Sequence, residues 1–153
     1  MKQIRARNQQ TGVMLLEALI AILIFSVGIL AIVGMQATAI QDQGEAKYRT
    51  EAAFLANRVV GQMWGAVGKT QGAIQANLAP FTYAGGGAVP SGIQPWVTTV
   101  QTMLPGATAF PPTIQVNPDN SVVVTVRWQA ARDKTNGAPP HRYQAIAYFN
   151  LSV

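Results

Sequence analysis

Residues 12–35 read GVMLLEALIAILIFSVGILAIVGM, and this stretch decides how the chain is organised. One carboxylate, Glu17, stands at the start of an apolar run, and residues 18–41 contain no charge. As a helix, residues 18–35 would extend about 27 Å, close to the roughly 30 Å hydrocarbon core of a bilayer. The sequence therefore predicts a helix that spans a membrane once.

The distribution of basic residues predicts the orientation of this helix. Lys2, Arg5 and Arg7 all precede the apolar run. Positive charge that flanks a membrane helix stays on the cytoplasmic side. We therefore expect the N-terminus in the cytoplasm and everything after about Gln36 on the other side of the membrane.

The composition limits the remaining possibilities. The chain has 153 residues, of which 49% are hydrophobic and only 11% are charged, against roughly 25% charged in an average soluble domain. This length allows one modest core and excludes a large multidomain enzyme. The net charge of +5 owes much to the three basic residues that precede the helix, so it is a weak argument for nucleic-acid binding. The absence of cysteine excludes disulfides, thiolate metal ligands and a cysteine nucleophile.

A secretory signal peptide is the first alternative reading of the N-terminus. A basic start and an apolar run are followed by Ala37-Thr38-Ala39, which has the small-residue pattern of a cleavage site. The apolar run of 18 residues, however, is longer than the usual 7–15 of such a segment. The carboxylate of Glu17 at its start is also out of character, so a retained helix is the favoured reading.

The string Gly12-Val13-Met14-Leu15-Leu16-Glu17, behind a short basic leader, resembles the N-terminus of type IV pilins and pseudopilins. The resemblance implies that prepilin peptidase cuts after Gly12 and that Val13 becomes an N-methylated terminus. It also implies that Glu17, fifth in the mature chain, pairs with the terminal amine of a neighbouring subunit. The family usually has phenylalanine after the cut, where this chain has Val13.

Several later segments resemble the PilV-type minor pilins, namely residues 34–36, 54–63, 96–106 and 122–128. This resemblance implies a low-abundance subunit that primes pilus assembly in a complex at the tip. The implied partners are prepilin peptidase, other minor pilins, the major pilin and the inner-membrane assembly platform. The implied location is the inner membrane, with a periplasmic head, and then the pilus. A minor pseudopilin of type II secretion is the closest rival, and a membrane-anchored periplasmic binding module is another.

The helix is expected to continue beyond the membrane segment, because no proline occurs before Pro80. After Asp42 the apolar residues recur at spacings of three and four, which predicts one buried stripe. We expect the helix to end near Trp64, where glycines become frequent. The stripe consists of Tyr48, Ala52, Leu55, Val59 and Met63.

The rest of the chain is predicted to form a small head. A loop is expected over residues 80–91, and a short helix over 95–104 with Trp96 and Met103 in the core. Strands are expected over residues 113–117, 121–129 and 143–153, with a hairpin turn at Pro118-Asp119-Asn120. Val122, Val124, Val126 and Trp128 should share one face of the middle strand. The predicted class is α+β, a long helix packed on a small antiparallel sheet as in pilins. It comprises a leader (1–12), a membrane helix (13–40), an amphipathic helix (41–66) and a head (67–153).

Catalytic and metal sites have little support in the sequence. The single histidine, His141, follows two prolines and is expected in a solvated loop. Asp119 and Asp133 are the only acids after Glu51, and both lie in turn-like sequence. We therefore expect neither enzymatic activity nor a cofactor.

One basic and aromatic group near the C-terminus raises the possibility of DNA or anionic-surface binding. Its members flank residues 130–140, which are more simply interpreted as a solvated hairpin loop. Nucleic acid is therefore not a favoured partner. The group consists of Trp128, Arg132, Lys134, His141, Arg142 and Tyr143.

Overall fold

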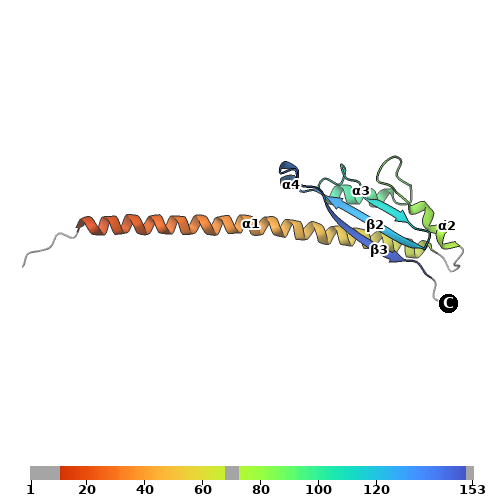
Figure 1. Cartoon of the computed structure of the whole chain (residues 1–153), viewed down its shortest axis with the longest axis horizontal. Helices are drawn as coiled ribbons and strands as arrows, with labels where there is room; N and C mark the ends of the chain where they lie inside the picture. The colour runs from red at the N-terminus through yellow and green to blue at the C-terminus, as the bar shows by residue number, and fades with distance from the viewer. Residues whose placement is uncertain (1–10, 68–72, 151–153) are drawn as a thin grey trace, which may run out of the picture. The chain divides into compact units, whose positions relative to one another are not determined.

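The computed structural model describes residues 11–67 and 73–150 (Figure 1). The chain divides into two units, residues 1–43 and 44–153, which are described separately. The leader's residues 1–10 and the last residues of the predicted third strand, 151–153, lie outside the described residues. In chain order the elements are α1 (Thr11–Ala66), α2 (Ile74–Leu78), the 3-10 helix η2 (Ala79–Phe81), α3 (Gln94–Met103), β1 (Thr113–Val116), β2 (Ser121–Trp128), α4 (Ala131–Thr135) and β3 (His141–Tyr148).

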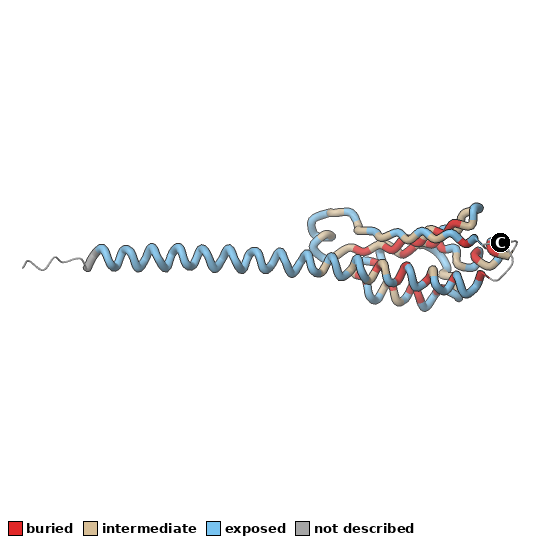
Figure 2. Tube along the Cα trace, turned by 90° about the horizontal axis from the view of Figure 1, so that it is seen from below, coloured by how far each residue is buried: buried red, intermediate tan, exposed pale blue. Residues whose placement is uncertain are grey.

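The first unit contains the start of α1 and is exposed along all of its described side chains (Figure 2). The hydroxyl of Ser26 donates to the carbonyl of Ile22 at 2.7 Å, and the hydroxyl of Thr38 to that of Gly34 at 3.3 Å. These polar groups are therefore satisfied within the helix, as a membrane segment requires. In length and hydropathy, α1 is able to cross a membrane.

In the second unit, the remainder of α1 packs its apolar stripe into the core (Figure 2). Ala52, Leu55, Val59 and Met63 are fully buried, and Tyr48 packs against them partly buried, so the predicted stripe is confirmed. Helix α3 packs on the same stripe. There the buried indole N–H of Trp96 donates to the carbonyl of Leu55 at 2.8 Å. The prediction that Trp96 belongs to the core is therefore confirmed.

The sheet has three antiparallel strands in the order β1-β2-β3 (Figure 1). Val122, Val124, Val126 and Trp128 of β2 are all buried on the face that meets α1 and α3, as the alternation predicts. The prediction of a long helix packed on a small antiparallel sheet, an α+β arrangement, is confirmed. The end of the sheet is anchored by Phe149, which is fully buried with its ring centroid 4.4 Å from that of Trp64.

The hairpin between β1 and β2 is closed by the predicted turn. The Asp119 carboxylate accepts from the Ser121 hydroxyl at 2.6 Å and from the Ser121 backbone N–H at 3.0 Å. Asn120 adopts the left-handed backbone (φ 62°) that asparagine tolerates better than most residues. Gln75 of α2 donates to the Asn117 carbonyl at 2.6 Å, which ties the turn to the helical layer.

Some predicted details are wrong. Met103 is 40% exposed rather than in the core, because Leu104, where the chain leaves α3, takes the buried position. The third strand runs over His141–Tyr148 instead of beginning at Tyr143, and it starts directly after Pro140, which has no N–H to donate to a ladder. The expected loop 130–140 contains the short helix α4.

The Asp119 turn generates a prediction with a defined pH dependence. The hydroxyl and backbone N–H of Ser121 lower the pKa of the Asp119 carboxyl below its ordinary value of 3.8. A lowered pKa in the folded state stabilises the fold above the unfolded-state pKa, and this contribution is lost as the pH falls through the folded-state pKa. Asp119→Ala should therefore lower the midpoint of thermal unfolding at neutral pH, and the difference from wild type should shrink as the pH falls from about 4 toward 2.

Asp119→Asn is the matched variant, because its amide oxygen can still accept from Ser121 but carries no charge. Its stability relative to Asp119→Ala should not change over the same acid range. A difference between wild type and Asp119→Ala that stays constant from neutral pH to about pH 2 would contradict the role of this carboxylate.

Candidate functional site

The start of α1 carries the residues that the sequence singles out. The peptide bond between Gly12 and Val13 lies in the first turn of the helix. Leu16, Glu17 and Ile20 stand three, four and seven residues after Val13, so all four lie on one side of the helix and border a shallow groove of about 320 Å³. Glu17 is exposed, and among residues 11–67 and 73–150 it has no basic partner. The groove therefore presents an unpaired carboxylate among apolar side chains.

This arrangement is chemically suited to capture a cation from another molecule. An ionised carboxylate at the centre of a bilayer costs about 2.5–3.5 kcal/mol on insertion scales. Glu17, near the start of the apolar run, can extend toward the interface and avoid most of that cost. Between packed helices it would have no such escape, and an ammonium or guanidinium partner would be needed to offset desolvation.

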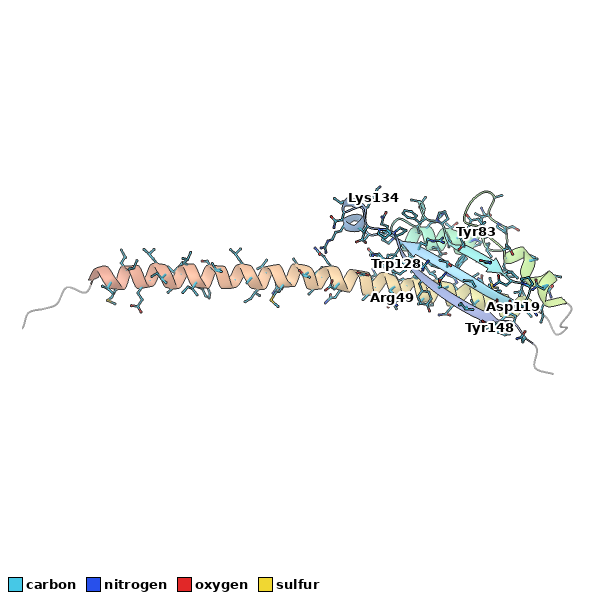
Figure 3. All side chains as sticks on the ribbon, in the orientation of Figure 1. Arg49, Tyr83, Asp119, Trp128, Lys134 and Tyr148 are labelled. Atoms are coloured by element: carbon cyan, nitrogen blue, oxygen red, sulfur yellow. The ribbon has the colours of Figure 1, made fainter. Side chains whose placement is uncertain are left out.

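The six residues of the basic and aromatic group do not form one surface, and two of them, Trp128 on β2 and Lys134 on α4, are labelled in Figure 3. Trp128 is only 2% exposed, and Tyr143 packs against the core, so neither offers a free ring for stacking on a base. Arg142 lies on the opposite, outward face of the sheet, since side chains alternate along β3. Arg132 and Lys134 are on α4.

His141 is the residue whose expected surroundings are wrong. It is the first residue of β3, half-buried, and its ring stacks on Trp128 with centroids 5.6 Å apart. Its Nδ1 lies 3.3 Å from Glu45 Oε1 on α1, and its Nε2 lies 3.2 Å from Asp133 Oδ2 on α4. Both contacts can be hydrogen bonds only in the imidazolium, because a neutral ring has a single N–H.

This cluster joins α1, α4 and β3 through one histidine. Asp133 Oδ2 also accepts from the Ala130 backbone N–H at 3.2 Å, so one carboxylate oxygen holds both the start of α4 and the histidine. In the part of the chain that the structure describes, no three histidine or acidic side chains converge as metal ligands. Sequence patterns missed the cluster because Glu45 is far from His141 along the chain and only the fold brings them together.

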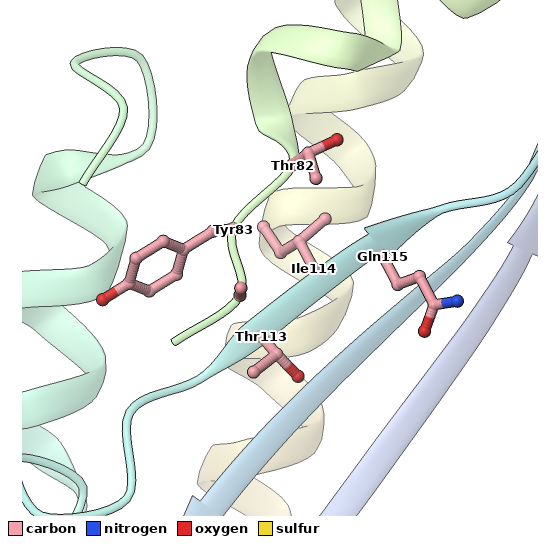
Figure 4. A pocket seen from close by; sticks show the side chains of 6 residues that line it. Thr82, Tyr83, Thr113, Ile114 and Gln115 are labelled. Carbon is pink, nitrogen blue, oxygen red and sulfur yellow. The ribbon is translucent and has the colours of Figure 1, made fainter. Parts of the chain in front are cut away.

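A second hollow, of about 340 Å³, lies at the outer side of β1 (Figure 4). Tyr83 runs beside β1 there, with its N–H donating to the Ile114 carbonyl at 3.0 Å and its carbonyl accepting from Ile114 at 2.8 Å. No carboxylate, histidine or basic side chain is among the lining residues, so the hollow offers no acid–base pair. It is lined by Thr82, Tyr83, Ala84, Thr113, Ile114 and Gln115.

The role of Asp133 can be tested by hydrogen exchange. Asp133→Ala removes the acceptor at the start of α4 and the contact with His141, so the amides of residues 131–135 should exchange faster. The loss should correspond to about 0.5–2 kcal/mol of local stability, as for other capping residues. Lys134→Ala, on the same helix, removes an exposed side chain and should leave exchange unchanged. Equal exchange rates in wild type and Asp133→Ala would contradict the assignment.

No family model matches the chain, and no curated protein or solved structure is significantly similar to it. The features that bear on its function come from its own sequence and structure. They are the exposed carboxylate of Glu17 on a membrane-length apolar helix and the small antiparallel sheet that packs on the later part of the same helix.

Proposed function

We propose that this chain is a minor pilin of a type IV pilus, cut by prepilin peptidase between Gly12 and Val13. In this proposal it helps to prime pilus assembly in a complex of minor pilins at the tip. The observation that carries the proposal is the position of Glu17. It is the only charge within a helical stretch that is otherwise apolar, and it stands four residues after the proposed new terminus.

The spacing gives Glu17 a physical role in assembly. In a helix, four residues correspond to about 6 Å, so Glu17 lies just inside the terminal amine of Val13. When such helices leave the bilayer and pack together, an unpaired carboxylate or amine would be costly. Pairing Glu17 with the terminal amine of a neighbouring subunit neutralises both groups. N-methylation of that amine would keep its positive charge and preserve the pair.

The exposed apolar surface at the start of α1 supports a helix that lies first in lipid and then among neighbouring helices. Every large apolar side chain from Val13 to Met35 is exposed, and buried apolar area stabilises by about 25 cal/mol per Å². Lipid can cover this surface before assembly, and neighbouring helices can cover it in a filament. The small antiparallel sheet behind the helix is the arrangement expected of a pilin head.

The partners in this proposal are prepilin peptidase, the major pilin, other minor pilins and the inner-membrane platform that assembles the filament. A type II secretion pseudopilin would share the same N-terminal chemistry. The two uses separate by where the mature subunit is found, in surface pili or in the secretion apparatus. A membrane-anchored binding module would share the helix but would need no cleavage after Gly12.

The first test is the mass of the mature protein isolated from its native cells. The expected N-terminus is Val13, with or without a methyl group, and Gly12→Asp should leave the leader attached. An intact Met1, or a start at Ile40 after cleavage of the Ala37-Thr38-Ala39 segment, would sink the proposal.

The second test separates the role of Glu17 from membrane insertion. Glu17→Ala should insert normally but should enter pili at least about tenfold less, because breaking a buried ion pair costs about 3–5 kcal/mol. Ser26→Ala is the matched control, since it also removes a polar group from the apolar helix but no charge. Immunoblots of membranes and of sheared pili give both quantities. Glu17→Ala present in pili at the wild-type level would refute the pairing role.

A further inference from the structure

Among the described residues, one edge of the three-stranded sheet has no pairing partner along its whole length. Strand β3 pairs with β2 alone, whereas the outer side of β1 is occupied at Ile114 by Tyr83. The edge that remains free is therefore the outer side of β3, over His141–Tyr148. An unpaired edge presents a row of backbone N–H and C=O groups to any extended chain that approaches.

The hydrogen-bond pattern identifies which groups face outward. The N–H of Phe149 donates to the Asn120 carbonyl at 3.0 Å, so position 149 faces β2. Alternation in an antiparallel pair then turns Tyr143, Ala145 and Ala147 toward β2. The same alternation points the backbone groups of four residues away from the sheet, and no backbone bond from another described residue meets them. These are the groups of Arg142, Gln144, Ile146 and Tyr148.

Beyond Arg142 at its start, this edge lacks the usual devices that block pairing. The register between β2 and β3 is unbroken over eight residue pairs, from Ser121↔Tyr148 to Trp128↔His141, so no bulge interrupts it. Residues 143–148 contain neither proline nor charge. Edges that must stay unpaired usually carry proline, lysine or a bulge. This strand is therefore competent to accept a further strand.

Apolar side chains on both faces of β3 are also incompletely buried. On the inner face Ala145 and Ala147 are only half-buried, although their partners Val124 and Val122 on β2 are fully buried. On the outer face Ile146 and Tyr148 are 60% and 61% exposed. One more strand would cover apolar surface on both faces at once.

A charge beside this edge indicates what the added strand should contain. Arg127 and Arg142 are direct cross-strand partners on the outer face, an arrangement that like charges disfavour. Arg127 Nη1 donates to the Pro111 carbonyl at 3.2 Å, whereas no carboxylate in the described chain pairs with Arg142. A second copy of β3 could not supply one, because its sequence HRYQAIAY has no acidic residue. A strand that complements this edge is therefore one that carries an acidic residue, and β3 of a second copy is not such a strand.

We propose that the open edge of β3 binds an extended segment of another polypeptide as a fourth strand, with alternating apolar side chains and a carboxylate beside Arg142. The proposal does not depend on whether the chain enters a pilus, because the edge belongs to the fold itself. Backbone bonds to Gln144 and Ile146 would provide affinity, and the carboxylate would set the register.

The test uses the full chain in detergent micelles and synthetic peptides of about eight residues that alternate valine and threonine. Two peptides carry glutamate at either the N-terminal or the C-terminal end, which distinguishes parallel from antiparallel addition. One of them should slow hydrogen exchange of the Gln144 and Ile146 amides by about tenfold or more. No slowing with either peptide at millimolar concentration would overturn the proposal.

Two variants show whether binding occurs at this edge. Ile146→Pro removes an outward N–H but no bond to β2, so the β2 amides should stay protected while peptide binding is lost. Arg142→Glu should reverse the preference, so that a lysine peptide binds about two- to fivefold more tightly than its glutamate counterpart. Unchanged peptide binding in Ile146→Pro, or an unchanged preference in Arg142→Glu, would contradict the proposed edge.

Discussion

A single carboxylate, Glu17, on the apolar stretch 13–35 of α1 is the constraint on which this account depends. From Val13 to Met35 the helix buries nothing of its own, so it must be covered by lipid or by other helices. Glu17 can be tolerated at a membrane interface, but between helices it requires a positive partner. In the proposed function, the same residue therefore permits membrane insertion and restricts which helix bundles can form.

In the second unit, the later part of α1 contributes to a buried core. Beyond Gly44, α1 acquires a buried stripe, and α3 and the sheet cover it. The indole of Trp96 fixes α3 on the stripe through the Leu55 carbonyl, while Phe149 fixes the end of the sheet beside Trp64. On β3, Ile146 and Tyr148 stay mostly exposed beside a strand edge that no described residue pairs with, which makes this edge a surface suited to a partner.

Local sequence patterns predict the helices and strands, whereas contacts between residues far apart in the chain are not predicted by them. The spacing of Leu55, Val59 and Met63 and the alternation of β2 are properties of neighbouring residues, so they were readable from the sequence. His141 was misjudged because its contacts with Glu45 and Asp133 exist only once α1, α4 and β3 meet. Trp128 belongs both to the patterned face of β2 and to the possible basic and aromatic group, and the structure buries it on that face. At the start of α1 the sequence shows a lone carboxylate before an apolar run, whereas the proposed assembly role of Glu17 rests on the resemblance to type IV pilins.

The most direct test of the account is the identity of the group that contacts Glu17 in the assembled filament. A carbodiimide joins a carboxylate directly to an amine without a spacer, so between subunits of a filament it links only groups in contact, and the product can be located by mass spectrometry. The account predicts an amide bond between Glu17 and the N-terminal residue of a neighbouring subunit in purified pili. A Glu17 that couples instead to a soluble amine added to the same pili would show that the carboxylate is exposed to water and would contradict the account.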